Sequence, residues 1–125
     1  MIKITHKGNF KNTERFLSRA QRMNLRAVLE KYGSAGISAL SKATPKDTGL
    51  TAISWEYKID ISPWGYSVKW YNTNESNGAV IALLIQYGHG TGTGGYVQGR
   101  DYINPAMTPI FDQMANDLWK EVTAL

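Results

Sequence analysis

The chain has no cysteine and only two histidines among its 125 residues. The missing cysteine excludes disulfides, thiolate nucleophiles and almost every structural zinc site. Long apolar runs are also missing, since the longest, residues 79–85, is too short to cross a bilayer. Residues 1–5 alternate like a strand and lack the apolar core of a signal peptide. We therefore expect a protein that uses no metal or other cofactor, contacts no membrane and works without secretion.

The net charge of +4 is unevenly distributed along the chain. Residues 1–58 contain eleven Lys or Arg against four Asp or Glu, and residues 59–125 contain three against six. The first part therefore carries +7 and the second part −3. Such polarity suits head-to-tail packing of identical copies, and it suits an anionic partner equally well.

A long helix is predicted near the N-terminus, capped by Asn12 or Thr13 and ending at Ala43. At 100° per residue, its apolar side chains cover an arc of about 200°, whereas one core needs an arc only somewhat wider than ~100°. The excess predicts contact with two bodies, the core and a neighbouring subunit. Gly33 and Gly36 weaken the helix, and we expect them to kink or divide it.

Four basic residues fall on one narrow stripe of this helix, namely Arg15, Arg19, Arg22 and Arg26. Four cations on one helix face form a positive surface that suits the binding of phosphate groups. A solvated helix face or a ladder of salt bridges between subunits explains the same spacing, and such faces are common. We favour the second interpretation and treat the four arginines as a candidate subunit or partner interface.

The segment Pro45-Lys46-Asp47-Thr48-Gly49 ends the helix. Pro45 disfavours helical geometry at the residue before it. We predict a turn here, in which the Asp47 side chain accepts hydrogen bonds from backbone groups that follow it, Thr48 continues the turn, and Gly49 adopts a positive φ. The motif is therefore interpreted as structural rather than chemical.

An aromatic hairpin is predicted after this turn. Residues 53–61 alternate in polarity, residues 62–65 suit a type I turn, and residues 66–70 alternate again. The apolar face of the first strand comprises Ile53, Trp55, Tyr57, Ile59 and Ile61. Since two strands alone are marginal, a third is expected from residues 2–5 or residues 96–98. The strict alternation favours core packing of these aromatics over a stacking platform for single-stranded nucleic acid.

Two further helices complete the predicted fold. Residues 79–87 follow a polar loop and suit a short helix capped by Asn77 or a buried strand, of which we favour the helix. The C-terminal helix is predicted to have Asn104 as its cap and Pro105 in its first position. One stripe of this helix is apolar: Ile110, Phe111, Met114, Leu118 and Val122. The sequence thus predicts a single α+β domain over residues 1–125, with a long N-terminal helix and a C-terminal helix packed on a small antiparallel sheet built around the hairpin.

Residues 87–96 form a glycine-rich stretch, with five of the twelve glycines inside eight residues. Glycine loses the most backbone entropy on folding, so we expect this loop to be mobile or to be held by something outside its own domain. Its spacing formally satisfies a dinucleotide fingerprint, but no helix follows at once, and no Gly-Lys-Ser/Thr completes a phosphate loop. His89 has no Ser or Asp in a recognisable catalytic relation, so we interpret it as a loop histidine.

The candidate interface residues of this stretch are Tyr87, Gly88, His89, Gly90 and Tyr96. No catalytic, cofactor-binding or metal-binding residue is predicted in the chain. A loop of this kind with little catalytic equipment around it favours an assembly component over an enzyme.

Several short motifs occur in a fixed order. A helix ending in Ala43-Thr44-Pro45-Lys46-Asp47-Thr48-Gly49-Leu50 precedes the hairpin, and after it come Gln86-Tyr87-Gly88-His89-Gly90 and then Tyr102-Ile103-Asn104-Pro105-Ala106 with the final helix. This combination resembles the tailed-phage neck family, the tail-completion or head–tail joining proteins similar to the lambda Z type. The resemblance spans nearly the whole chain, and only the combination of motifs is specific.

The chain departs from the family's pattern at two places. The family usually carries Pro-Phe before the Pro-Ala of the last helix, where this chain has Asp101-Tyr102-Ile103-Asn104. The family often has a basic residue between the equivalents of Gly49 and Leu50, and this chain has none. Both departures concern the geometry of loops.

The resemblance implies a non-enzymatic virion protein that forms a hexameric ring in the neck, at the head–tail junction, after a period in the host cytoplasm. It implies adjacent head-completion and tail-terminator proteins as partners, and proximity to the DNA of the channel. The alternative from another class is a small nucleic-acid-binding module that uses the stripe of Arg15, Arg19, Arg22 and Arg26.

Overall fold

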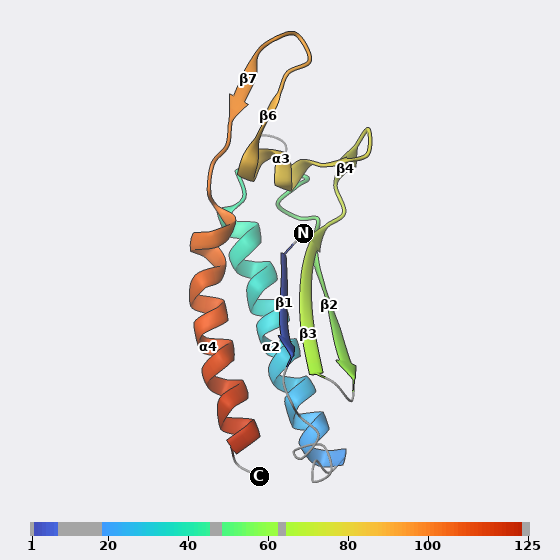
Figure 1. The fold of residues 1–125 in the computed structure, drawn as a ribbon, viewed down its shortest axis with the longest axis vertical. Helices are drawn as coiled ribbons and strands as arrows, with labels where there is room; N and C mark the ends of the chain where they lie inside the picture. The colour runs from blue at the N-terminus through green and yellow to red at the C-terminus, as the bar shows by residue number, and fades with distance from the viewer. Residues whose placement is uncertain (1, 8–18, 46–48, 63–64, 124–125) are drawn as a thin grey trace.

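The computed structural model describes residues 2–7, 19–45, 49–62 and 65–123. Its elements in chain order are β1 (Ile2–Lys7), α2 (Arg19–Ala43), β2 (Trp55–Ser62), β3 (Gly65–Asn72), β4 (Glu75–Ser76), β5 (Ala79–Val80), α3 (Ile81–Tyr87), β6 (Gly88–Gly90), β7 (Tyr96–Gln98) and α4 (Ile103–Thr123) (Figure 1). This is the α+β class that the sequence predicts. The start of the long helix, Arg15, Asp47 and Thr48 lie outside the described residues.

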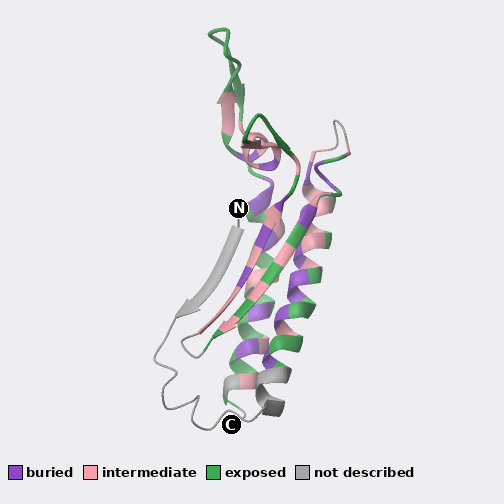
Figure 2. Ribbon diagram, turned by 90° about the vertical axis from the view of Figure 1, so that its right-hand side faces the viewer, coloured by how far each residue is buried: buried purple, intermediate pink, exposed green. Residues whose placement is uncertain are grey.

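The main sheet has three antiparallel strands in the order β1-β3-β2. Val68 of β3 lies opposite Ile4 of β1 and Ile59 of β2. The third strand is therefore β1, one of the two predicted sources, whereas residues 96–98 pair with β6 in a separate ribbon. Helices α2 and α4 lie behind one face of the sheet, and in the view of Figure 2 none of the described helices covers the other face.

The two glycines in the middle of α2 allow the helix to lie close to the sheet. A Cβ added at Gly36 would lie 2.4 Å from Nε1 of Trp70, and one at Gly33 would lie 2.5 Å from the Tyr57 ring. Trp70 is fully buried and donates its indole N–H to the carbonyl of Gly33 at 2.9 Å. The expectation of a divided helix is wrong, since α2 is continuous from Arg19 to Ala43. The glycines serve close packing instead.

Helix α2 ends at Ala43, as predicted, and the next residue joins it to the sheet. Buried Thr44 donates its hydroxyl to the Leu40 carbonyl at 2.6 Å and accepts the indole N–H of Trp55 at 2.8 Å. Gly49 has φ +74°, which confirms the predicted positive φ. Ile53, however, belongs to the turn before β2 and is 78% exposed, so its predicted place on the apolar strand face is wrong.

The predicted polar loop at residues 72–78 contains a small hairpin. Asn77 at φ 51° and Gly78 at φ +80° form its two-residue loop between β4 and β5. Positive φ at both central residues is the pattern that Asn-Gly favours in tight hairpins. Asn77 therefore does not cap α3, which is helical as favoured and has Val80 at its N-cap without a side-chain hydrogen bond.

Helix α4 begins at Ile103, so Asn104 lies inside its first turn and is not the cap. The backbone N–H groups of Tyr102 and Ile103 instead donate to Oε1 of Gln86, at 3.0 and 2.9 Å. Met114 and Leu118 of the predicted apolar stripe are buried in the core. The acceptor at the start of α4 therefore comes from a side chain of α3 and not from the residues next to the helix.

None of the helices in the described part of the chain has the length and apolar character needed to span a membrane.

Candidate assembly surface: the β6–β7 arm

Residues 87–99, called the arm from here on, extend beyond the body at the end of the molecule that carries α3 (Figure 1). The candidate residues Tyr87, Gly88, His89, Gly90 and Tyr96 come together in it. The register pairs His89 with Val97 and Gly90 with Tyr96. The arm is a two-stranded ribbon, and β6–β7 pairing links its two sides.

The base of the arm is fixed by Gln86, whose side chain is buried. Its Nε2 donates to Oδ1 of Asp101 at 2.8 Å, while its Oε1 accepts the two N–H groups at the start of α4. The Arg100 N–H also donates to the Ile85 carbonyl at 2.9 Å. One side chain thus connects the residue before the arm to the residues after it.

Just beyond Gln86, two glycines bring the two sides of the arm into direct backbone contact. A Cβ at Gly88 would lie 2.6 Å from the Val97 carbonyl oxygen, and one at Gly99 would lie 2.6 Å from the Tyr87 carbonyl carbon. Gly88 also has φ +80°, a conformation that L side chains rarely adopt. Neither position has room for a side chain, so the base of the arm depends on glycine at both places.

The tip of the arm is closed by Thr91. Its N–H donates to the Gly95 carbonyl at 3.0 Å, and its hydroxyl accepts the Gly95 N–H at 3.1 Å. Gly92 and Gly94 have φ +81° and +90°, so the tip uses conformations that favour glycine. The glycine-rich loop therefore forms a ribbon with hydrogen bonds of its own, and its mobility in the free subunit stays a prediction.

The arm presents large side chains to solvent. Tyr87 is 69% exposed, Tyr96 66% and Val97 46%. Tyr96 donates its hydroxyl to the Tyr87 carbonyl at 3.2 Å, which leaves its ring on the outside of the ribbon. An isolated two-stranded ribbon is at best marginally stable in water. A surface that joins another protein would bury these side chains.

Catalytic chemistry has little support around the arm. The Nδ1 atom of His89 lies 3.0 Å from the Gly90 carbonyl oxygen, its only hydrogen-bond contact among the described residues. No group of three His, Cys, Asp or Glu side chains within the described ranges is placed to hold a metal ion. Burial raises the pKa of nearby Tyr102 to about 12, so this phenol stays neutral and donates to the Ala82 carbonyl at 2.8 Å.

The arginine stripe lies apart from the arm. Arg19, Arg22 and Arg26 belong to the N-terminal part of α2, at the opposite end of the molecule (Figure 1). Arg26 is exposed. The two sets of candidate interface residues therefore do not form one site.

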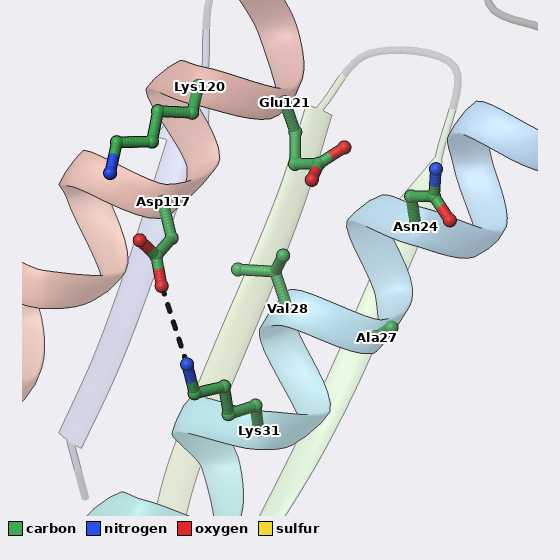
Figure 3. A pocket seen from close by; sticks show the side chains of 7 residues that line it. All are labelled: Asn24, Ala27, Val28, Lys31, Asp117, Lys120 and Glu121. Carbon is green, nitrogen blue, oxygen red and sulfur yellow. Dashed lines mark ion pairs between the residues drawn. The ribbon is translucent and has the colours of Figure 1, made fainter.

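An open groove of about 420 Å³ lies between α2 and α4 (Figure 3). It is lined by Asn24, Ala27, Val28, Lys31, Asp117, Lys120 and Glu121. Nζ of Lys31 lies 3.7 Å from Oδ2 of Asp117, which also accepts a hydrogen bond from the Tyr32 hydroxyl. This hydrogen bond is the main reason that the pKa of Asp117 is lowered and that of Tyr32 is raised. The network holds the two helices together and leaves a rim of mixed charge.

The sheet contains a feature that the sequence analysis missed. The register places Lys69 of β3 directly opposite Lys58 of β2 and Lys3 of β1. Like charges at directly opposite positions are destabilising. Neither Lys58 nor Lys69 forms an ion pair with any residue that the structure describes. This row of lysines cannot be recognised without the register of the strands, because the three residues are far apart in sequence.

Comparison with protein-family models, with curated proteins and with solved structures finds no match.

Proposed function

We propose that this chain is a structural protein of a tailed bacteriophage, which forms a ring in the neck, completes the tail and joins it to the head. The observation that carries the proposal is the arm, a two-stranded ribbon whose tyrosines face solvent beyond the body. Tyrosines are enriched in the cores of protein interfaces. The order of motifs along the chain resembles that of the neck family, and this resemblance is the reason for proposing a neck ring.

The expected partners are further copies of the chain, in a hexameric ring, and the adjacent head-completion and tail-terminator proteins. A ring of identical subunits needs contacts between two different patches on each subunit. The uneven charge along the chain, +7 against −3, is compatible with such head-to-tail contacts. The protein would act in the virion neck, near the channel DNA, after its synthesis in the host cytoplasm.

Electron microscopy of particles made without this protein tests the proposal. We expect full heads and finished tails that are not joined, and joining on addition of the purified protein. A His89→Ala variant tests an enzymatic role, and a variant that still joins heads to tails would dismiss that role. Normal virions in the absence of the protein would refute the neck role.

A nucleic-acid-binding module is the second candidate, favoured by exposed Arg26 and by the row of Lys3, Lys69 and Lys58. Its test is the affinity of the isolated protein for duplex DNA at several salt concentrations. Contacts to Z phosphates give a slope of about −0.9Z in a plot of log affinity against log salt. Tight, strongly salt-dependent binding that Lys58→Gln and Lys69→Gln weaken would favour this candidate over the ring.

A further inference from the structure

Two exposed surfaces of this molecule carry no formal charge. The arm has no Asp, Glu, Lys or Arg over residues 87–99, and residues 49–55, the turn before β2, have none either. The turn exposes Leu50 at 52% and Ile53 at 78%. Depletion of charge and exposure of large apolar or aromatic side chains characterise the cores of protein interfaces. Both surfaces therefore have the composition of contact surfaces.

The turn is held in place by its other residues. Thr51 and Ala52 are buried. The Thr51 carbonyl accepts a hydrogen bond from Nδ2 of Asn72, and its hydroxyl accepts one from Nδ2 of Asn74, both at 2.8 Å. Because these bonds fix the turn from the inside, Leu50 and Ile53 are held outward as a preformed apolar patch.

The two surfaces occur at the same end of the molecule, on either side of α3 (Figure 1). The chain's own arm does not cover the turn, since Ile53 remains largely exposed. A cyclic ring of identical subunits joins two different patches of each subunit. The arm and the turn are two such patches.

The two tyrosines of the arm supply part of the area that a contact between copies needs. Tyr87 and Tyr96, at their exposed fractions, offer roughly 200–350 Å² of the ~800 Å² that each partner of a standard interface buries. Val97 and the backbone of the ribbon add to this area, and each subunit of a ring contributes both its arm and its turn.

We propose that the arm of one subunit packs on the turn of the next copy, covering Leu50 and Ile53. This inference rests on the proposed function, since it assigns the two patches through which the ring closes.

Cysteine cross-linking tests the contact. Because the sequence has no native cysteine, only the introduced cysteines can react. Ile53→Cys and Val97→Cys proteins are purified separately, mixed and treated with a short bismaleimide. We expect a covalent dimer in the mixture and none from either protein alone, because a head-to-tail contact joins unlike patches. The double variant should yield a ladder of covalent oligomers. Trp119→Cys, at an exposed position on α4, replaces Val97→Cys as the control and should give no dimer with Ile53→Cys.

An independent measurement uses Ile53→Asp, which places a charge in the centre of the proposed contact. Light scattering should show loss of the oligomer with an unchanged melting temperature, since Ile53 contributes little to the core. A protein that stays monomeric at all concentrations, or that cross-links equally through Trp119→Cys, overturns the inference. Either result leaves the neck role to be decided by the particle phenotype, so the two proposals fail separately.

Discussion

Glycine at position 36 decides how closely α2 approaches the sheet. The indole of Trp70 occupies the space that a Cβ would need, and the carbonyl of Gly33 accepts its N–H. Two opposing effects therefore meet at this residue. Alanine would favour the helix by about 1 kcal/mol, whereas forcing an atom into a packed core typically costs about 1–3 kcal/mol.

Gly36→Ala is expected to lower the free energy of unfolding, because the nearest atom to the new Cβ is part of a buried indole that cannot move away. Urea unfolding with a shared slope measures the change. Ser34→Ala, at an exposed position of the same helix, is the control and should be neutral or slightly stabilising. A more stable Gly36→Ala protein would contradict the close packing described above.

Gly49 presents a different case, because a Cβ there would meet no atom within 4 Å while its φ is +74°. Gly49→Val should therefore lower stability by about 1–3 kcal/mol through backbone strain alone. Gly49→Asn is the matched variant, since Asn tolerates this conformation, and it should retain most of the stability. If Gly49→Val melts normally but fails to join heads to tails, the segment from Pro45 to Gly49 is a docking surface rather than a structural motif.

At the scale of elements, one side chain from α3 organises both the arm and α4. Gln86 accepts two backbone N–H groups at the start of α4 and donates to Asp101 after the arm. Local sequence favoured Asn104 as the cap, because Asn before Pro is a common helix start. The tertiary contact supplies an acceptor one residue before the helix instead, and no local pattern marks Gln86 for that role.

Gln86→Met keeps the side-chain length but removes the acceptor and the donor. We expect the free energy of unfolding to fall by about 1–3 kcal/mol, because two N–H groups lose their partner in a buried setting. The amides of Tyr102 and Ile103 should exchange faster in hydrogen-exchange experiments. Gln98→Met, at an exposed position of β7, should change neither quantity.

The arm itself is expected to change protection on assembly. Its ladder is short and exposed, which is typical of segments that open at low free-energy cost. Amide exchange over residues 88–99 should therefore be fast in the free subunit and slow in the assembled neck. Equal protection in both states would indicate that the arm has no role in assembly.

At the scale of the whole molecule, the sequence predicted the class of fold better than the contacts between its helices and strands. Periodicity located α2, β2, β3 and α4, because each buries one face. It misjudged Gly33 and Gly36, whose reason lies in aromatic side chains far along the chain. It missed the lysine row and the Leu50–Ile53 patch for the same reason, since both depend on register and tertiary position.

The arginine stripe gives a test of assembly at this scale. On the interpretation of the stripe as an outward helix face, reversing Arg19 and Arg22 to Glu should leave the monomer folded, because surface charge changes usually alter stability by about 0.5 kcal/mol. If the stripe forms subunit contacts, light scattering should show that ring formation is blocked. Lys42→Glu, at an exposed position near the other end of α2, is the control. An unchanged ring in the double variant would leave the stripe as a solvated helix face.

The glycine contact at the base of the arm determines how the length of the arm can vary among relatives of this protein. Gly88 and Gly99 bring the two sides together before the ribbon extends outward, and the residues beyond them are not among the buried residues of the core. Side chains of a ribbon alternate between its two faces. The arm can therefore lengthen or shorten by two residues on each side and still present Tyr96 on the same face. Relatives with different partners should differ in arm length by such steps while the body stays constant.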